Sequence, residues 1–228
     1  MPAPISVIMP TRNAADAMPR AIASLMEGLE AGILRELIVS DGGSSDACAD
    51  IAEAAGATFI SGSASRGGQL RRGCATARGD WLMIIHADSR LQPGWAKAVD
   101  TALQSPPAAW HFRLQFDVSG AAAGWVAGWA NWRARALGLP YGDQGLLLPR
   151  VLYDSVGGYS DIPLMEDVAL AKALRGHHRQ LPARIETSAS RYQKDGWARH
   201  GARNIWRLMK YNLGAAPADL SRNYDHRD

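Results

Sequence analysis

Residues 78–90 read RGDWLMIIHADSR, a short apolar run that ends in polar side chains. Its segment 81–85 is the most apolar strand-like run of the chain and predicts a β-strand. His86 and Asp88 follow it at positions i and i+2. These positions project from the same side of an extended chain, so an imidazole and a carboxylate converge where a divalent cation can bind. A single Asp after a strand is also common as a simple turn residue, and both interpretations stay open on these residues alone.

Short apolar runs alternate with helix-like stretches through the first hundred residues. Four strands and the three helices between them are predicted at residues 5–9, 15–30, 37–39, 46–55, 58–60, 67–78 and 81–85. This alternation is typical of βαβ units around a largely parallel sheet and therefore predicts an α/β fold. Leu70, Cys74 and Ala77 share one face of the third helix, so we expect them to pack on the sheet.

Polar loops follow three of these strands, at residues 10–13, 41–46 and 86–89. In open α/β sheets ligands bind outside the carboxyl ends of the strands, so we expect the three loops to border one crevice. The loop 41–46 (DGGSSD) is also compatible with a simple capped turn between strand and helix. No Gly-x-Gly-x-x-Gly follows the first strand, which argues against a nicotinamide-dependent Rossmann enzyme.

From about residue 106 the pattern changes. Trp110, Phe112, Leu114 and Phe116 alternate with polar residues, which predicts a strand at 110–117 with one buried and one solvated face. The remaining expected elements are a helix rich in Trp and Ala, the Gly-rich segment 139–145, a strand at 146–148, helices near 150–156, 166–176 and 196–213, and a polar tail.

The composition is that of one globular domain. Of 228 residues 47% are hydrophobic and 21% charged, and the net charge is only +3, which argues against an intrinsically disordered chain. The N-terminus lacks the features of a signal peptide, and no apolar run reaches the roughly 20 residues of a membrane-spanning helix, so we expect a cytoplasmic protein. Cys48 and Cys74 are expected to be buried, reduced thiols. We expect no nucleic-acid partner.

Glu166 and Asp167 form a pair of adjacent carboxylates at the start of a predicted helix. Acidic side chains in a first turn favour the helix dipole, which is a purely structural explanation. If the pair faces a nucleotide crevice, it would instead supply a general base.

Two helical patterns allow more than one interpretation. Trp125, Trp129 and Trp132 form one stripe, which we interpret as core or dimer interface in preference to a platform for sugars. The helix near 196–213 mixes basic and apolar residues. We prefer a solvated basic face over a packed apolar one, and the alternative is a helix lying on an anionic membrane surface, peripheral to the inner face of the membrane.

Five ordered segments resemble one known family over nearly the whole chain. They are ISVIMPTRN (5–13), LIVSDGGSSD (37–46), RGDWLMIIHADSR (78–90), GGY (157–159) and MED (165–167). In order and spacing they look like a family 2 glycosyltransferase of GT-A fold. Gly42 and His86 depart from the usual acidic residues of that pattern. Together with segments 141–145 and 162–167, they resemble the bacterial subgroup named for arsenosugar biosynthesis.

The resemblance implies an inverting transfer of a sugar from a nucleotide-diphosphate sugar to an acceptor hydroxyl, usually with Mn²⁺ or Mg²⁺. The acceptor would be a small molecule or lipid-linked. A single domain is expected, with a nucleotide-binding half at 1–105, an acceptor half at 106–213 and a tail at 214–228. The alternatives are a sugar-phosphate nucleotidyltransferase and a non-catalytic module that binds a membrane surface or a partner. The first would carry a Gly-rich basic loop after the first strand, where residues 10–13 read PTRN.

The resemblance also implies roles for single residues on the donor side. Asp41 matches an Asp that contacts the base or the ribose, and Asp88 matches the last residue of the Asp-x-Asp metal motif, with His86 in its first position. Asp167 matches the carboxylate that deprotonates the acceptor, with Glu166 beside it. Three further residues are expected near the nucleotide: Thr11, Arg66 and Gln69.

Two more groups complete the predicted site. Arg191, in the segment Ser190-Arg191-Tyr192, resembles an element that lies near the donor diphosphate, and a planar guanidinium suits bidentate phosphate contact. Tyr141, Asp143 and Gln144 offer an aromatic ring, a carboxylate and an amide between glycines, and we expect them to hold the acceptor. The competing interpretation is a tight turn in which Asp143 bonds nearby backbone N–H groups.

Overall fold

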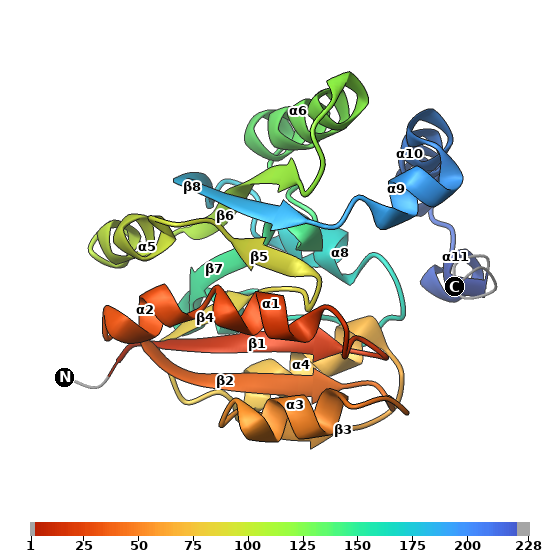
Figure 1. The fold of residues 1–228 in the computed structure, drawn as a ribbon. Coiled ribbons are helices and arrows are strands. Elements are labelled where there is room, and N and C mark those ends of the chain that lie inside the picture. The colour runs from red at the N-terminus through yellow and green to blue at the C-terminus, as the bar shows by residue number, and fades with distance from the viewer. Residues whose placement is uncertain (1–2, 223–228) are drawn as a thin grey trace.

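The structure is a computed structural model that describes residues 3–222. One eight-stranded sheet runs through it, in the order β3-β2-β1-β4-β7-β6-β8-β5 (Figure 1). The strands are β1 (Ile5–Thr11), β2 (Leu34–Asp41), β3 (Thr58–Ser61), β4 (Trp81–Ile84), β5 (Ser89–Leu91), β6 (Ala109–Phe116), β7 (Leu146–Pro149) and β8 (His178–Thr187). The α/β class expected from the sequence is confirmed.

Helices connect and cover these strands. They are α1 (Met18–Ala23), α2 (Met26–Glu30), α3 (Cys48–Ala54), α4 (Arg66–Thr76), α5 (Trp95–Leu103), α6 (Ala121–Leu137), α7 (Arg150–Ser155), α8 (Glu166–Ala173), α9 (Ser190–Asp195), α10 (Trp197–Asn212) and α11 (Pro217–Arg222), with a 3₁₀ turn η1 (Gly142–Gln144). No helix in the described range is long and apolar enough to cross a membrane.

The first half of the sheet is parallel. β1 lies between β2 and β4 and pairs with both in parallel, and β3 joins β2 in the same sense. The carboxyl ends of β1, β2 and β4 therefore share one edge, and Thr11 lies beside Asp41 in the pairing of β1 with β2. β7 then runs antiparallel to β4, which brings the second half of the chain to the same edge.

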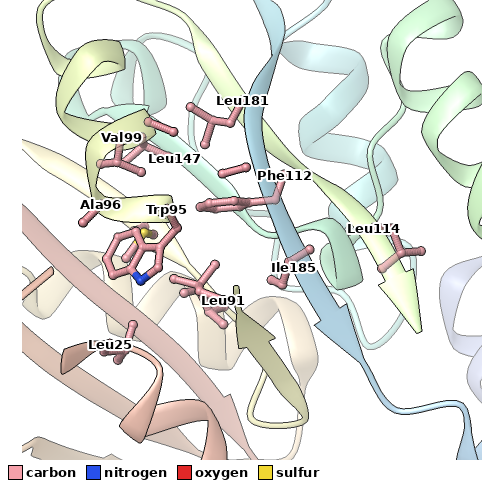
Figure 2. Close-up of a cluster of buried hydrophobic side chains, with 14 of the residues drawn as sticks. Leu25, Leu91, Trp95, Ala96, Val99, Phe112, Leu114, Leu147, Leu181 and Ile185 are labelled. Carbon is pink, nitrogen blue, oxygen red and sulfur yellow. The ribbon is translucent and has the colours of Figure 1, made fainter. Parts of the chain in front are cut away.

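Three hydrophobic clusters cover the sheet, and the two larger ones lie on opposite faces of β4. Side chains of β4 alternate between them: Leu82 belongs to one and Met83 to the other, as the period of a strand requires. Figure 2 shows the largest cluster, in which Trp95 of α5 and Phe112 of β6 are fully buried. The indole Nε1–H of Trp95 donates to the carbonyl of Ser24 at 3.0 Å, so burying this large ring leaves no polar group unsatisfied.

Most of the expected elements are present. Leu70, Cys74 and Ala77 are buried against the sheet as predicted, and Cys48 is a buried free thiol like Cys74. The predicted solvated face of the strand over 110–117 is wrong at one position. His111 is 1% exposed because β6 is a central strand between β7 and β8.

Several elements were not expected, among them β5, α5, β8 and α9, and the helix expected at 15–30 is divided into α1 and α2. β8 contains Pro182, and a Pro normally argues against a central strand. The register of β6 with β8 shifts here, since His111 pairs with Gln180 whereas Arg113 pairs with Arg184. Pro182 therefore lies in a bulge, where its missing N–H is tolerated.

Two helix faces differ from their predictions. The tryptophans of α6 are exposed, Trp125 by 71%, so they are not part of the core, and the small residues of this helix face β6 instead. The other predicted role of the tryptophans, in a dimer interface, stays a prediction. In α10 the buried residues are His200 and Arg207, whereas Trp206 and Met209 are exposed, so beyond Trp197, which packs on the core, the expected packed apolar face is not observed. The predicted polar tail at 214–228 contains α11, and its residues 223–228 lie outside the described range.

Candidate active site

Two cavities adjoin at the carboxyl edge of the parallel strands. The first cavity, of about 480 Å³, is bordered by the loop after β1, the start of α4 and the loop after β4. The second cavity, of about 160 Å³, is bordered by η1, the start of α8 and the helices α9 and α10. Arg66, His86, Asp88 and Arg191 line both cavities and so form a shared rim.

Asp41 anchors the loop after β2. Its carboxylate accepts hydrogen bonds from the hydroxyls of Thr11 and Ser44, at 2.9 and 2.5 Å, and from the N–H groups of Gly43 and Ser44, both at 2.8 Å. Burial acts to raise the pKa of Asp41, but these hydrogen bonds outweigh it and the pKa lies below its usual range. Asp41 is 2% exposed and is not among the residues that line the two cavities. The structure therefore gives it a role in shaping the loop.

Gln69 explains one departure from the family pattern. Its amide donates to the carbonyls of Thr11 and Ser40, at 2.6 and 3.1 Å, and so joins α4 to the ends of β1 and β2. A Cβ at position 42 would lie 2.9 Å from this amide. A side chain at position 42 would have to displace the Gln69 amide, which explains why glycine suits this position. Gln69 also borders the first cavity, together with Thr11.

The shared rim is built around His86. Arg66 approaches His86 Nδ1 with its Nη2 at 3.3 Å and Glu166 Oε1 with its Nε at 3.6 Å. On the other side of the ring, a Cβ at Gly142 would be 2.5 Å from His86 Nε2. Burial, together with the nearby guanidinium of Arg66, lowers the pKa of His86 to about 3. The ring is therefore neutral, and its Nδ1 accepts from Arg66.

The carboxylate pair begins α8. Met165, just before it, has a left-handed backbone with φ of +68°, which is a strained conformation for a residue with a side chain. Glu166 is 3% exposed, and its Oε2 has no hydrogen-bond partner among the described residues. Burial, with the charge of Asp167 beside it, raises the pKa of Glu166 to about 7.

Asp167 points into the second cavity. Its Oδ2 accepts from the N–H of Gly142 at 2.9 Å, and its Oδ1 accepts from the N–H of Val168 at 2.7 Å. The backbone of η1 thus holds this carboxylate against the cavity.

The Gly-rich segment contributes two of its three predicted residues to the cavity. Tyr141 lines it and lies under the guanidinium of Arg133, whose Cζ is 3.3 Å from the ring centroid. Asp143 also lines it, with Oδ1 buried and unpartnered within the described part of the chain, and burial raises the pKa of Asp143 to about 6. Gln144 is fully buried and contacts Arg133 and Asn131. Gln144 supports the turn from behind and does not line either cavity, which corrects its predicted place.

Residues of α9 and α10 that sequence reasoning missed close the second cavity. His200, Asn204 and Arg207 line it from one face of α10. The rings of Phe116, Tyr192 and Trp197 lie about 5 Å apart and dock the two helices on the end of β6. The spacing i, i+4, i+7 of the three polar residues was the available signal, because it places them on one helical face.

Comparison with known proteins identifies the family. Residues 6–142, more than half of the chain, match the sequence profile of Glycosyl transferase family 2. The chain belongs to this family. No curated protein sequence gives a significant match.

Solved structures similar to this family 2 chain share its fold at low sequence identity. TarS 1-349 from S. aureus has a TM-score of 0.62 and 14% identity over 93% of this chain and 66% of its own. Mannosyl-3-phosphoglycerate synthase from Rubrobacter xylanophilus has a TM-score of 0.63 and 19% identity. The match covers 92% of this chain and 74% of the synthase. Glucosyl-3-phosphoglycerate synthase from Mycobacterium tuberculosis has a TM-score of 0.54 and 21% identity. The match covers 81% of this chain and 70% of the synthase. The expected GT-A fold is confirmed. This chain spans 66% of TarS 1-349 and 40% of a longer TarS structure.

The shared rim of this family 2 site offers one carboxylate, that of Asp88, as a ligand for a divalent cation. Asp88 is exposed there and also borders a third cavity of about 200 Å³. Among the residues that the structure describes, no group of three or more His, Cys, Asp or Glu could hold a metal ion. This arrangement fits a hard cation that binds one carboxylate and completes its shell with substrate phosphate oxygens and water. Because Nδ1 of the neutral His86 ring accepts from Arg66, the ring carries its proton on Nε2, and the structure gives no support to His86 as a second ligand.

Proposed function

We propose that this chain is an inverting glycosyltransferase that moves a sugar from a nucleotide-diphosphate sugar to an acceptor hydroxyl, with Mn²⁺ or Mg²⁺. The observation that carries the proposal is the rim between the two cavities. It places Asp88 and the two guanidinium groups of Arg66 and Arg191 between a larger cavity and the one that contains Asp167.

The donor would occupy the first cavity. Thr11 and the residues that follow it line this cavity, and Arg66 and Arg191 would neutralise a diphosphate at the rim. Asp88 would hold the cation, which when bound supplies positive charge to the leaving diphosphate. TarS 1-349 has been solved with UDP-GlcNAc, and the M. tuberculosis synthase with Mn²⁺ and UDP. These complexes support uridine nucleotides as the first donors to test.

The reaction would be one in-line displacement. Asp167 takes the proton of the acceptor hydroxyl as the oxygen attacks the anomeric carbon, and the bond from that carbon to the diphosphate oxygen breaks. The electron pair leaves with the nucleotide diphosphate, and the anomeric configuration is inverted. Glu166 lies beside the base and, with its pKa raised to about 7, is partly protonated near neutral pH. It would limit the negative charge next to Asp167.

The acceptor would enter the second cavity. Tyr141 and Asp143 line one wall and α10 lines another, which offers a ring face and polar groups to a polyhydroxylated ligand. A small-molecule or lipid-linked acceptor is expected, and the resemblance to the arsenosugar subgroup makes precursors of such sugars one group to test.

Thermal shift with a panel of nucleotide diphosphates, with and without Mn²⁺, tests the donor site. A ligand that binds only the native state raises stability by RT ln(1 + [L]/Kd), so one nucleotide should raise Tm in a Mn²⁺-dependent way. Asp88→Ala should abolish this dependence, whereas Asp100→Ala, an exposed carboxylate on α5, should keep it. An unchanged Mn²⁺-dependent shift in Asp88→Ala would remove Asp88 from the site.

A further inference from the structure

Helix α10 is turned with its polar side toward the protein and its apolar side toward solvent. His200, Asn204 and Arg207 line the second cavity. The exposed large apolar residues of α10 and its C-cap are Ile205 at 42%, Trp206 at 56%, Met209 at 49% and Leu213 at 85%. Successive residues of a helix are turned by about 100° around its axis. These four residues therefore lie on one side of α10, opposite the residues that line the second cavity. Such an orientation is the reverse of that of an ordinary surface helix.

Helix α6 contacts α10 (Figure 1). It adds more exposed aromatic side chains. Trp125, Trp129 and Trp132 are 71%, 40% and 45% exposed, and the rings of Trp129 and Trp132 stack at 5.0 Å. We call the exposed apolar residues of the two helices, together with Arg199 and Lys210 of α10, the α6–α10 face. Single exposed apolar residues are ordinary on proteins, whereas several large ones on two neighbouring helices favour an interaction surface.

The charge of this surface is uniformly positive. Neither α6 nor α10 contains an Asp or Glu. Arg199 and Lys210 are exposed beside the apolar arc, and Lys210 Nζ lies 5.4 Å from the ring centroid of Trp206. A second copy of the chain docked through the same surface would bring identical cations together, which is unfavourable. An anionic partner avoids this repulsion.

We propose that the α6–α10 face binds the surface of an anionic lipid bilayer. Tryptophan side chains favour the level of the lipid headgroups, apolar side chains enter the acyl boundary, and Lys and Arg attract anionic lipids. The features needed for this binding are therefore present on one pair of helices. The inference is independent of the chemistry in the two cavities.

Co-sedimentation of the full chain with vesicles tests the proposal. Phosphatidylcholine vesicles containing phosphatidylglycerol should bind the protein at low salt, and vesicles of pure phosphatidylcholine should bind it far less. The double variant Trp206→Gln/Met209→Gln and the double variant Arg199→Glu/Lys210→Glu should each weaken binding at least about 10-fold. Val151→Gln and Lys97→Glu, exposed residues on α7 and α5, are the matched controls and should bind as the wild type does.

Quenching of tryptophan fluorescence by brominated lipids in the unsubstituted protein gives a second readout that does not depend on variants. Strong quenching is expected with phosphatidylglycerol present. Absence of binding to anionic vesicles, or equal binding by the face and control variants, would overturn the proposal. So would a concentration-dependent dimer that the same face variants abolish, because the face would then be an interface between copies.

Discussion

Gly142 lies between His86 of the shared rim and the proposed base Asp167, and it contacts both. Its N–H holds Asp167 Oδ2, and its missing Cβ leaves room for the ring of His86. A larger residue would displace either the imidazole or the carboxylate. The glycine therefore fixes the distance between the end of β4, which carries Asp88, and the proposed base. This double contact explains why the turn η1, which precedes β7, contains a glycine at this position.

Asp167→Asn is expected to lower kcat about 10²–10⁴-fold with donor affinity nearly kept, because the amide cannot take the proton of the acceptor. Steady-state kinetics and calorimetry with the nucleotide diphosphate measure the two effects separately. Glu166→Gln should lower kcat less. An equal loss of nucleotide affinity in Asp167→Asn would instead make Asp167 part of the donor site.

Glu166 should make the protein less stable as the pH rises from about 5 to 8. Its pKa is raised by burial from 4.5 to about 7, so the folded state favours the protonated form. The contribution of protonated Glu166 to the free energy of unfolding is complete below the pKa of the unfolded chain. It is lost as the pH rises through the pKa of Glu166 in the folded state. Relative to Glu166→Gln, the wild type should lose on the order of 1–3 kcal/mol of unfolding free energy across this range. Urea denaturation at several pH values measures the difference, and a constant difference would contradict the prediction.

At the scale of elements, local sequence patterns predicted the strands and helices that carry a strong pattern of their own. They did not predict features that depend on contacts with distant segments. β1 to β4 and α4 carry strong apolar runs or periodic faces, and each was expected near its observed position. β8 was missed because its Pro182 is tolerated only in a bulge formed with a strand some 70 residues earlier. The direction of α10 was missed because a helix with a strong amphipathic pattern does not itself say which face meets the protein.

The start of α4 depends on close packing against the segment before α8. A Cβ at Gly67 would lie 2.0 Å from the carbonyl oxygen of Ser160, and the Gly67 N–H donates to the carbonyl of Ile162 at 3.0 Å. Gly67→Ala should therefore destabilise the fold by about 1–3 kcal/mol. Gly124→Ala in α6, where a Cβ meets open space, should stabilise it by about 0.5–1 kcal/mol. Urea midpoints report both, and equal shifts would refute the packing argument.

At the scale of the whole molecule, the two halves are joined by Arg150. This first residue of α7 donates to the carbonyls of Cys74, Ala77 and Gly79, at 3.2, 2.6 and 3.0 Å, where α4 ends and β4 begins. Arg150→Met should cost about 2–4 kcal/mol, because three carbonyls lose a charged donor. Arg78→Met should cost less, because the Arg78 side chain is 69% exposed and Glu36 keeps its hydrogen bonds from the Ser6 hydroxyl and the residue 78 N–H. Chemical denaturation compares them, and similar losses would mean that Arg150 does not join the halves.

The candidate site was predicted in outline and not in detail. Loops after parallel strands meet by topology, so the convergence of Thr11, His86 and Asp88 followed from the alternation of elements. That Asp41 would use its carboxylate within its own loop, and that Gln144 would be buried, depends on hydrogen bonds to residues from other segments. The wall made by α9 and α10 depends on an aromatic contact with Phe116, which no local pattern encodes.

The pairing of β5 with β8 has a consequence for how the protein is made. Ser89 and Leu91 pair with Thr187 and Ile185, so the strand that follows Asp88 gains its partner only after nearly a hundred more residues have left the ribosome. A nascent chain can form the parallel strands early, but its Asp88 loop stays without that support until β8 emerges, and Arg191 follows just behind. The proposed donor site would therefore be completed only late in translation, once β8 and Arg191 have both been made.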